Sequence, residues 1–366
     1  MVNNVYWKPD RVVSYNAYMN FLVGQRGVGK TYALTKKMIN DFIKHGKMFA
    51  YVRRREVELD KINKFFDDMI FNNEFPNVEF EVRLDTYGAE FYINEKLAGH
   101  AIPLSHQRYY KSYAYPELYN IMFDEFIIST GGSAQYLKKE VTEFAELQQS
   151  LLRKRWGNIY FIGNALSISN PYFAFHKIDM SWKESIKVIG RFTKEYVEQF
   201  TREDFESDEE MNMFMSFVGR PLMLVERVYS KGHEKEMLKS PFGALYAGTA
   251  YGDYAMSNKF LLDDTQFVKK KSNKSSCQYA IRFDGSTYGL WYDYNDKDIY
   301  VVDNVFDPNV QTAVIISNDH DPTTLYVGRS HHRIKEMKDA YHNSRLWFNN
   351  EQCYGKFKEV LRLVGL

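Results

Sequence analysis

The pattern of apolar and polar residues in the first half of the chain alternates between strand-like and helix-like segments. Residues 19–23 (MNFLV) and 48–52 (MFAYV) are short apolar runs of the kind found in buried strands. Helical segments are expected after them, over 32–39 and 58–71. In the second helix the apolar residues recur at spacings of three and four: Leu59, Ile62, Phe65, Phe66, Met69 and Ile70. Such alternation is typical of an α/β protein with a mainly parallel sheet.

The same alternation continues to about residue 164. Two strands with alternating polarity are expected on either side of a turn at Tyr87-Gly88. These two strands are 78–82 and 90–93. The remaining elements predicted in this half are strands at 97–104, 121–123 and 159–162, and a helix at 137–153. The first half therefore predicts one α/β domain over residues 1–190.

The pattern changes after residue 190. An acidic run over 203–210 includes Ser207 and Glu210 at the spacing of a capping box, which predicts a helix continuing into 211–217. Short helical signals and scattered glycines then extend to about residue 256. We expect a small helical connector over 191–256.

From about Gln266 the chain becomes rich in strand signals. Three consecutive antiparallel strands are predicted at 279–285, 288–292 and 299–303, with turns at Asp284-Gly285 and Asn295-Asp296. A helix over 333–342 and a closing helix complete the pattern. Residues 257–366 are thus expected to form a separate α+β domain.

Composition narrows the class of protein. The 366 residues are 45% hydrophobic, which suits two domains of ordinary size, and the net charge of +1 means that any basic surface must be local. Cys277 and Cys353 lie far apart without metal-ligand spacing, which favours a reducing compartment. No apolar run approaches the ~18–20 residues that span a bilayer, and the amino terminus does not resemble a signal peptide. We therefore expect a soluble cytoplasmic protein.

The motif with the clearest chemistry is GQRGVGKT, a complete phosphate-binding loop between an apolar strand and a helix. Its members are Gly24, Gln25, Arg26, Gly27, Val28, Gly29, Lys30 and Thr31. Backbone N–H groups of such a loop surround the phosphates, and the helix that follows favours their negative charge. Lys30 is expected to reach the β- and γ-phosphates of ATP, and the Thr31 hydroxyl to bind Mg²⁺.

A second motif, IMFDEF at residues 121–126, is an apolar strand that ends in two carboxylates. Asp124 is expected to hold the magnesium ion and Glu125 to polarise the attacking water. A surface acidic pair is the alternative interpretation. Together with the strand at 48–52, the glutamate after the aspartate indicates the ASCE type of P-loop ATPase, which has an inserted strand and its own catalytic glutamate. These enzymes typically work as rings that move polymers, an inference by analogy.

The sequence around both motifs resembles the DNA-encapsidation ATPases of small tailed bacteriophages of the phi-29 type. The similar stretches are Val23–Thr31, Tyr51–Arg54, Leu97–Ser105, Met122–Phe126, Gly163–Ala165 and Asn170–Phe173, and more weakly Phe242–Tyr254 and the hairpin near 279–292. The resemblance implies a homomeric ring, a pentamer, on the portal vertex of an empty capsid in the bacterial host cytoplasm. It would drive double-stranded DNA inward with ATP and Mg²⁺, docked on the portal and on a structural RNA.

The resemblance also implies cations that act on the nucleotide of a neighbouring subunit. Arg153 falls at the arginine-finger position of the family and Lys111 at the position of a trans-acting lysine. An exposed basic cluster at a helix end is the alternative for Arg153. Asn164, at the end of its strand, could sense the γ-phosphate or orient water, or be a buried turn asparagine.

One position departs from the family pattern. Relatives carry a lysine shortly after Arg53-Arg54, where this chain has Glu56. Arg53 or Arg55 could take over that contact, or the arginines could flank the adenine.

The carboxy-terminal domain resembles the ribonuclease-H-like nuclease of large terminases, reduced to nucleic-acid binding. A two-metal nuclease needs converging carboxylates, and the candidates are Asp284, Asp303 and Asp339. A terminase with an active nuclease is the alternative function, and a module with a purely structural nucleotide site is another. The basic residues Lys269, Lys270, Lys271 and Lys274 are candidates for phosphate contacts, or belong to a solvated linker.

Overall fold

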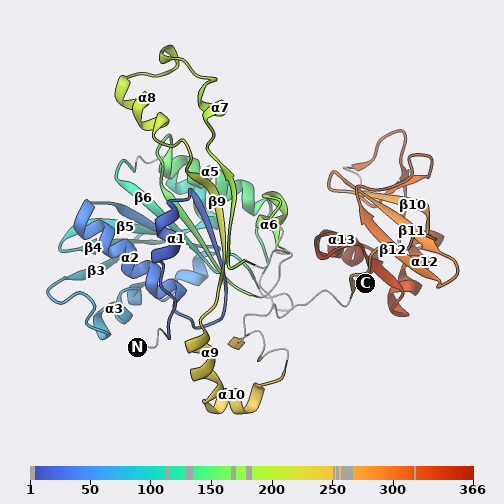
Figure 1. Cartoon of the computed structure of the whole chain (residues 1–366), viewed down its shortest axis with the longest axis horizontal. Helices are drawn as coiled ribbons and strands as arrows, with labels where there is room; N and C mark the ends of the chain where they lie inside the picture. Colours follow the sequence, from blue (N-terminus) through green and yellow to red (C-terminus); the bar gives the residue numbers. More distant parts are fainter. Residues whose placement is uncertain are drawn as a thin grey trace. The chain divides into compact units, whose positions relative to one another are not determined.

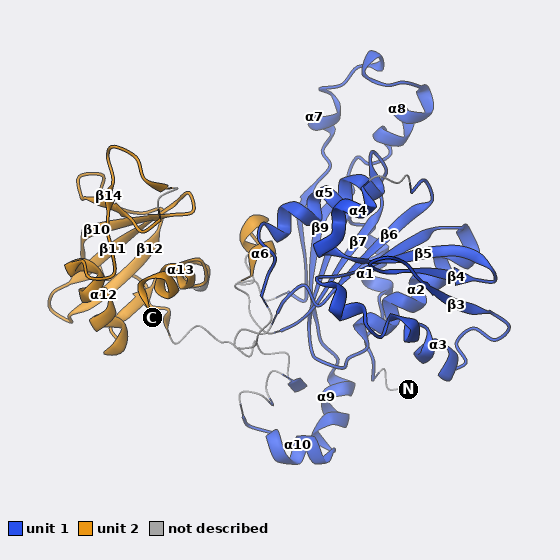
Figure 2. Cartoon of the chain, turned by 180° about the vertical axis from the view of Figure 1, so that it is seen from behind, with its two compact units in different colours: residues 1–166, 182–261 blue, residues 167–181, 262–366 orange. Residues whose placement is uncertain are grey.

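The computed structural model describes residues 5–111, 115–128, 135–165, 170–178, 184–249, 252, 255–256, 267–316 and 319–366. The chain divides into two compact units, shown in Figure 2. Unit 1 comprises residues 1–166 and 182–261, and unit 2 comprises residues 167–181 and 262–366. Within the described part, no helix is both long and apolar enough to cross a membrane.

Unit 1 is built on a nine-stranded sheet in the order β3-β4-β5-β2-β6-β7-β1-β9-β8. Six neighbouring strands, from β5 to β9, are parallel, and the edge strands β3, β4 and β8 pair antiparallel. The bounds are β1 Met19–Gly24, β2 Met48–Arg53, β3 Phe80–Leu84, β4 Ala89–Ile93, β5 Lys96–Pro103, β6 Leu118–Asp124, β7 Asn158–Asn164, β8 Ile186–Arg191 and β9 Pro221–Val228. The predicted mainly parallel α/β sheet is confirmed.

Two long helices pack on opposite faces of this sheet. Successive residues of a strand point to opposite faces, so Leu22 and Phe21 of β1 enter different layers. Leu22 lies in the core cluster with Leu34, Met38 and Ile39 of α2 (Lys30–His45). Phe21 stacks on Phe161 with ring centroids 4.5 Å apart, and Phe161 contacts Phe144 of α5 (Glu140–Leu152). Both helices connect the carboxyl end of one strand to the next, as expected of parallel βαβ units.

The strand inserted between the phosphate-loop strand and the acidic strand is β7, and not the strand at 48–52. β7 pairs with β1 on one side and with β6 on the other, whereas β2 lies beyond β6. The order of strands in the sheet differs from their order in the sequence because the chain, after β6 and α5, enters the sheet between β6 and β1. The ASCE arrangement is present, but its inserted strand is β7, so the prediction that assigned this role to 48–52 is wrong.

The helix predicted over 58–71 is replaced by three short turns of helix. These are 3-10 helices at Glu56–Leu59 and Ile62–Lys64, followed by α3 (Asp67–Phe71). The consecutive residues Phe65 and Phe66 both contact Phe91 of β4, at centroid distances of 4.3 and 5.4 Å. Consecutive positions of a continuous α-helix point about 100° apart, so packing on the sheet favours the broken form.

The helical connector predicted over 191–256 is also corrected. β9 lies in the middle of this range and pairs in parallel with β1, so a boundary at residue 190 would divide the sheet. Residues 192–220 extend away from the sheet (Figure 1) and carry α7 (Lys194–Val197), a 3-10 helix at Arg202–Asp204 and α8 (Asp208–Met215). After β9 come α9 (Lys231–Leu238) and α10 (Pro241–Tyr246). The remaining helices of unit 1 are α1 (Asp10–Tyr15), a 3-10 turn at Leu104–His106 and α4 (Gln107–Tyr110).

The predicted cap of α8 is present in part. The Ser207 hydroxyl accepts a hydrogen bond from the Glu210 backbone N–H at 3.2 Å. The Glu210 carboxylate accepts from the N–H of Glu206 instead of returning to Ser207. Its other oxygen accepts from Lys154 Nζ at 2.8 Å.

Unit 2 contains a six-stranded sheet in the order β14-β13-β10-β11-β12-β15. The three predicted antiparallel strands are confirmed as β10 (Ser276–Phe283), β11 (Ser286–Asp293) and β12 (Asp298–Asp303). The first turn has positive φ at both Asp284 and Gly285, a conformation that favours the sequence Asp-Gly. The other elements are α6 (Pro171–Phe175), β13 (Thr312–Val314), β14 (Leu325–Tyr326), α12 (His332–His342), β15 (Leu346–Phe348) and α13 (Glu351–Val364).

A buried carboxylate in β9 makes the stability of unit 1 depend on pH. Glu226 is buried, and both of its oxygens accept from Trp7 Nε1, at 3.2 and 3.1 Å. Burial raises the pKa of Glu226 from 4.5 to about 7, with Trp7 and Arg11 opposing the shift. The folded state therefore binds this proton more tightly than the unfolded state does. Its contribution to stability is fully present below pH 4.5 and is lost as pH rises to about 7.

Glu226→Gln is therefore expected to stabilise the protein at alkaline pH, because an amide keeps an acceptor for Trp7 without a charge. The gain in unfolding free energy should be near zero at pH 4.5 and approach about 3 kcal/mol above pH 8. Urea unfolding of the variant and the wild type at several pH values measures it. Glu236→Gln, on the exposed side of α9, is the control and should show no such trend. An equal effect of Glu226→Gln at all pH values would contradict the assignment.

Candidate nucleotide-binding site

The phosphate-binding loop connects β1, which ends at Gly24, to α2, which begins at Lys30. Gly27 and Gly29 have φ of 72° and 87°, a conformation that favours glycine. A Cβ on Gly24 would lie 1.9 Å from the carbonyl oxygen of Val228 in β9. The glycines of the motif are thus required by backbone geometry, and the free N–H groups at the start of α2 are available to an anion.

Lys30 is buried at the centre of this loop. Its Nζ donates to the carbonyl oxygens of Gln25 (2.6 Å) and Gly24 (3.3 Å) and to Oδ1 of Asn164 (3.3 Å). Burial lowers the pKa of Lys30 to about 8, and the nearby charge of Asp124 opposes this shift. All three hydrogen-bond partners are neutral oxygens, so an anionic phosphate would be a better partner for the ammonium.

Thr31 and Asp124 lie side by side, as the two motifs predict. Thr31 Oγ1 donates to Asp124 Oδ2 at 3.1 Å, and Tyr51 OH donates to the same oxygen at 3.4 Å. Burial raises the pKa of Asp124, and the positive charge of Arg53 counteracts it. A hydroxyl beside a carboxylate is a donor set that suits Mg²⁺, which binds one or two protein oxygens together with phosphates and water. These residues therefore fit the predicted ion.

Glu125 follows Asp124 but points to an arginine. Its backbone has a φ of 57°, and 58% of its side chain is exposed. Arg53 Nη2 donates to Glu125 Oε2 at 2.6 Å, while Arg53 Nε donates to Glu58 at 3.1 Å. Arg53, which was predicted to contact ATP, thus holds the carboxylate that was predicted to activate water. Glu125 must leave this pair before it can act as a base.

A buried ion pair fixes the backbone behind Glu125. Arg54 Nε and Nη2 donate to the two oxygens of Glu140 at 2.8 and 3.0 Å, and the two side chains are 3% and 1% exposed. The same guanidinium donates to the carbonyl oxygens of Glu125 (3.1 Å) and Phe126 (2.9 Å). This pair could not be predicted from the sequence, because nothing local connects residues 86 positions apart.

We expect Arg54→Ala to destabilise unit 1 by about 3–5 kcal/mol, because it leaves the Glu140 carboxylate buried without its partner. Urea unfolding measures the loss. Arg83→Ala is the matched control. The Arg83 side chain is 52% exposed and pairs with Glu81. The control should cost less than about 1 kcal/mol. Equal losses in the two variants would contradict the distinction.

Asn164 ends β7 beside the end of β1. The register pairs Gly24 with Asn164, and Asn164 Oδ1 accepts from Lys30 Nζ. The structure therefore brings Asn164 to the phosphate loop, together with Lys30, Thr31, Asp124 and Glu125.

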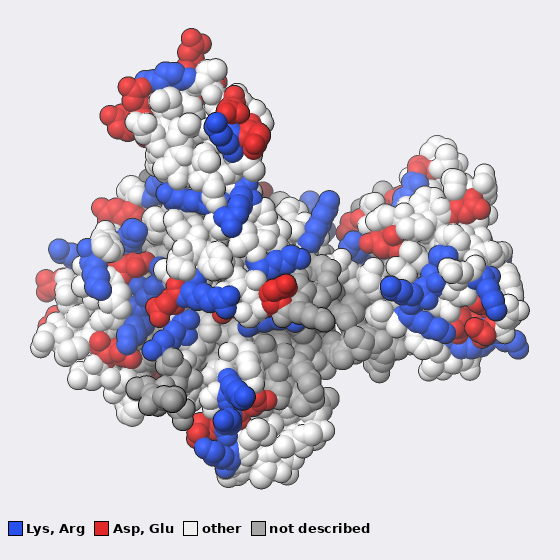
Figure 3. Space-filling model, in the orientation of Figure 1, with Lys and Arg blue, Asp and Glu red and all other residues white. Residues whose placement is uncertain are grey.

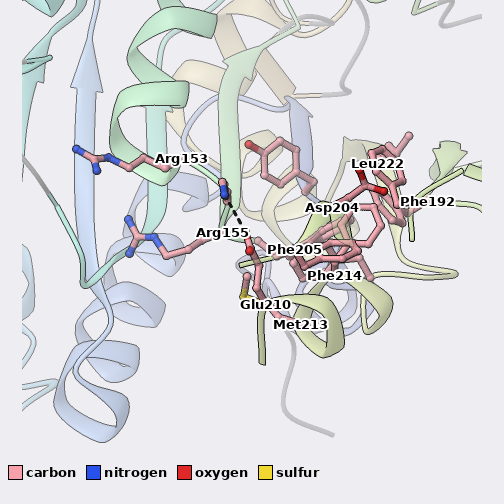
Figure 4. A pocket seen from close by; sticks show the side chains of 14 residues that line it. Arg153, Arg155, Phe192, Asp204, Phe205, Glu210, Met213, Phe214 and Leu222 are labelled. Atoms are coloured by element: carbon pink, nitrogen blue, oxygen red, sulfur yellow. Dashed lines mark hydrogen bonds and ion pairs between the residues drawn. The ribbon is translucent and has the colours of Figure 1, made fainter. Parts of the chain in front are cut away.

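Arg153 lies at the other end of the sheet. It follows α5, and Gln148 of the same helix donates to the hydroxyl of Tyr18, just before β1. Six residues of strand separate Tyr18 from Gly24, or about 20 Å. An arginine side chain cannot span that distance, so Arg153 does not reach the phosphate loop of its own chain. Figure 4 shows Arg153 and Arg155 pointing away from the aromatic group of Phe192, Phe205 and Phe214.

Lys111 is close to Arg153. Both residues line one surface hollow, with Gln149, Ser150 and Lys154. Lys111 pairs with Glu146 of α5. The Arg153 backbone has φ 52° and ψ −121°, a conformation that is strained for any residue other than glycine. The two cations that the resemblance named thus line the same surface hollow.

The carboxylates proposed for a nuclease have other surroundings. Asp303 accepts from Lys356 Nζ at 2.8 Å, Asp284 lies exposed in the β10–β11 turn, and Asp339 lies exposed on α12. Among the described residues, no group of three or more histidine, cysteine, aspartate or glutamate side chains could hold a metal ion.

The four lysines before β10 are not equivalent. Lys269 Nζ pairs with Asp298 at 2.6 Å and lies over the Tyr300 and Trp347 rings, and Lys271 lies over Trp291 at 4.2 Å. Lys270 and Lys274 are exposed. On the face that Figure 3 shows, basic and acidic side chains are interspersed over both units, which agrees with the small net charge.

The model of the podovirus DNA encapsidation protein (Gp16) family matches residues 1–218 and 210–364. The chain belongs to this family. The resemblance predicted from the sequence is thus confirmed.

Curated members of similar length extend the match over the whole chain. The DNA packaging protein of Bacillus phage PZA is 32% identical over 370 residues, covering 100% of both chains. That of Bacillus phage phi29 is 31% identical with the same coverage. A solved structure, the bacteriophage Phi-29 viral genome packaging motor assembly, aligns with a TM-score of 0.73 and 30% identity, covering 98% of this chain and 99% of the other. The Phi-28 gp11 DNA packaging motor, 19% identical with a TM-score of 0.60, shares the fold.

Proposed function

We propose that this protein is an ATP-driven motor that moves double-stranded viral DNA into a preformed capsid. The observation that carries the proposal is the convergence of Lys30, Thr31, Asp124 and Asn164 around the phosphate loop. The relatives are named as DNA packaging proteins and as a genome packaging motor assembly, which supports the packaging of DNA as the process that ATP drives.

ATP would bind with its phosphates on the backbone N–H groups of residues 24–31. Lys30 would exchange its carbonyl partners for phosphate oxygens, which are better acceptors because they are charged. Thr31 and Asp124 would hold Mg²⁺, which when bound would neutralise phosphate charge.

Hydrolysis requires a base for the attacking water, and Glu125, which follows Asp124 in the acidic motif, would take this role. Its pair with Arg53 holds the carboxylate away from that task, so turnover begins when the pair opens. Arg54 and Glu140 keep the backbone of Glu125 in place while the side chain moves.

Arg153 and Lys111 would act on the nucleotide of a neighbouring subunit. The distance of Arg153 from its own loop and the surface hollow that it shares with Lys111 support this role. A cation supplied from another subunit stabilises negative charge in the transition state. A homomeric ring follows from such sharing, and we expect a pentamer on the portal vertex.

The remaining partners are double-stranded DNA, the portal of the procapsid and a capsid structural RNA, met in the cytoplasm of the bacterial host. Of the four lysines before β10, Lys270 and Lys274 are exposed and would be available for phosphate contacts, which would be sequence-independent and weakened by salt.

Packaging of DNA into purified procapsids tests the function, with DNase-resistant DNA and released phosphate as readouts. We expect both to require ATP and Mg²⁺, and Lys30→Ala to abolish both. Full packaging by Lys30→Ala would show that the nucleotide site is only structural. Metal-dependent cutting of the DNA that is lost in Asp303→Asn would favour a nuclease-bearing terminase.

A further inference from the structure

The side chain of Gln25, the second residue of the phosphate loop, is fully buried. Its Oε1 accepts from the backbone N–H of Ser230 at 2.6 Å, and its Nε2 donates to the carbonyl oxygen of Met256. The backbone of the same residue accepts from Lys30 Nζ at 2.6 Å. One residue thus connects the phosphate-binding lysine to two segments more than 200 positions away.

Those two segments lie on either side of α9 and α10. Ser230 is the N-cap of α9, and Met256, which is 2% exposed, follows α10. The contact between Ser230 and the loop is accompanied by a second one, because His233 Nε2 lies 3.1 Å from the carbonyl oxygen of Arg26. In the sequence, Met256 lies near the end of unit 1, and the strands of unit 2 begin at β10. The phosphate loop therefore contacts the chain both before α9 and after α10.

Packing alone does not require a glutamine at this position. The course of the loop is already set by its glycines and by the hydrogen bond from Gln25 N to Val228 O at 3.1 Å. A buried amide is costly unless both of its polar ends are paired, and here both ends are paired with backbone of the α9–α10 segment. What the amide adds is a specific connection between that segment and the loop.

Nucleotide binding acts directly on this residue. A phosphate that draws Lys30 Nζ to itself removes the hydrogen bond on the Gln25 carbonyl, and the loop N–H groups turn to the anion. We propose that Gln25 is a positioning residue that couples occupancy of the phosphate loop to the segment from Ser230 to Met256. This rests on the proposed nucleotide site, and it gives unit 1 a path by which the state of the nucleotide reaches the connection to unit 2.

Two substitutions distinguish the contact of Gln25 with Ser230 from its contact with Met256. Gln25→Glu keeps an acceptor for Ser230 N–H but loses the donor to Met256 and sets a negative charge against that carbonyl. Gln25→Ala removes both contacts. The control is Asn158→Ala, at the other end of the sheet, because the Asn158 amide is also buried and donates to Ala17 O at 3.0 Å and Asn16 Oδ1 at 3.2 Å.

The experiment is amide hydrogen exchange of the full-length protein, with and without Mg²⁺ and a nonhydrolysable ATP analogue, alongside a direct binding titration. In the wild type, the analogue should slow exchange by roughly tenfold in peptides containing Ser230 and in peptides containing Met256, the factor expected for about one hydrogen bond of local stability. Gln25→Glu should lose the effect at Met256 and keep it at Ser230. Gln25→Ala should lose both, and Asn158→Ala neither.

The titration separates two kinds of failure. If the wild type does not bind the analogue, the proposed function fails and the coupling with it. If it binds and exchange is unchanged at both segments, only the coupling is overturned. An undiminished effect in Gln25→Ala, or its loss in Asn158→Ala as well, would equally overturn a role of Gln25.

Discussion

Glu125→Gln is expected to bind ATP about as tightly as the wild type and to hydrolyse it more slowly by a factor on the order of 10³. The substitution leaves Lys30, Thr31 and Asp124 untouched, so the phosphates and the metal ion keep their partners. The amide can still accept from Arg53, but it cannot take a proton from water. Titration with a fluorescent ATP analogue and measurement of phosphate release separate binding from turnover.

Glu58→Gln is the matched control for this result. Glu58 also accepts from Arg53, at 3.1 Å, but it follows β2 and is not part of the acidic motif. Its turnover should remain within a few-fold of the wild type. Similar losses in the two variants would mean that the Arg53 pairing, and not a base at residue 125, determines the rate.

Arg153→Ala is expected to lower turnover of the assembled motor by a factor on the order of 10³ or more, the effect of removing a transition-state arginine. Arg153 lies near the amino end of β1, and the length of that strand, about 20 Å, separates it from its own loop. The loss must therefore come from a neighbour's site. Mixing variant and wild-type subunits should therefore reduce activity more steeply than dilution of the wild type alone. Phosphate release at a series of mixing ratios, with DNA and procapsids present, measures this.

Lys154→Ala provides the comparison. Lys154 is the next residue and is 70% exposed, but it pairs with Glu206 and Glu210 of the segment between β8 and β9. Its replacement should leave the mixing curve linear. A linear curve for Arg153→Ala as well would contradict a shared active site.

The parts of the site that could be predicted are those set by local sequence and by parallel strands. The loop, Asp124 and Asn164 each follow a buried strand, and parallel strands bring their carboxyl ends to one edge of a sheet. The pair between Arg53 and Glu125 could not be foreseen, because both residues carry expected roles toward ATP and only the fold shows that they meet. The Arg54–Glu140 pair is likewise a product of tertiary structure.

The errors in the fold have related causes. The apolar run at 221–225 is long enough for a strand, but it lies among glycines and helix signals, and nothing local shows that β9 pairs with β1. The residues Phe65 and Phe66 have helical spacing with their neighbours, yet both pack on Phe91 and break the helix. Unit 2 also includes α6, which the linear sequence places inside the first domain. In each case contacts between distant residues decided the outcome.

The most direct test of the account is a structure of the protein with Mg²⁺ and a nonhydrolysable ATP analogue. We expect the phosphates on the N–H groups of residues 24–31, Lys30 Nζ on a phosphate oxygen instead of the Gln25 carbonyl, and Mg²⁺ beside Thr31 and Asp124. Glu125 should have left Arg53 to face the γ-phosphate. An analogue bound elsewhere, with Lys30 still on its carbonyl partners, would contradict the assignment of this loop as the site where ATP is hydrolysed.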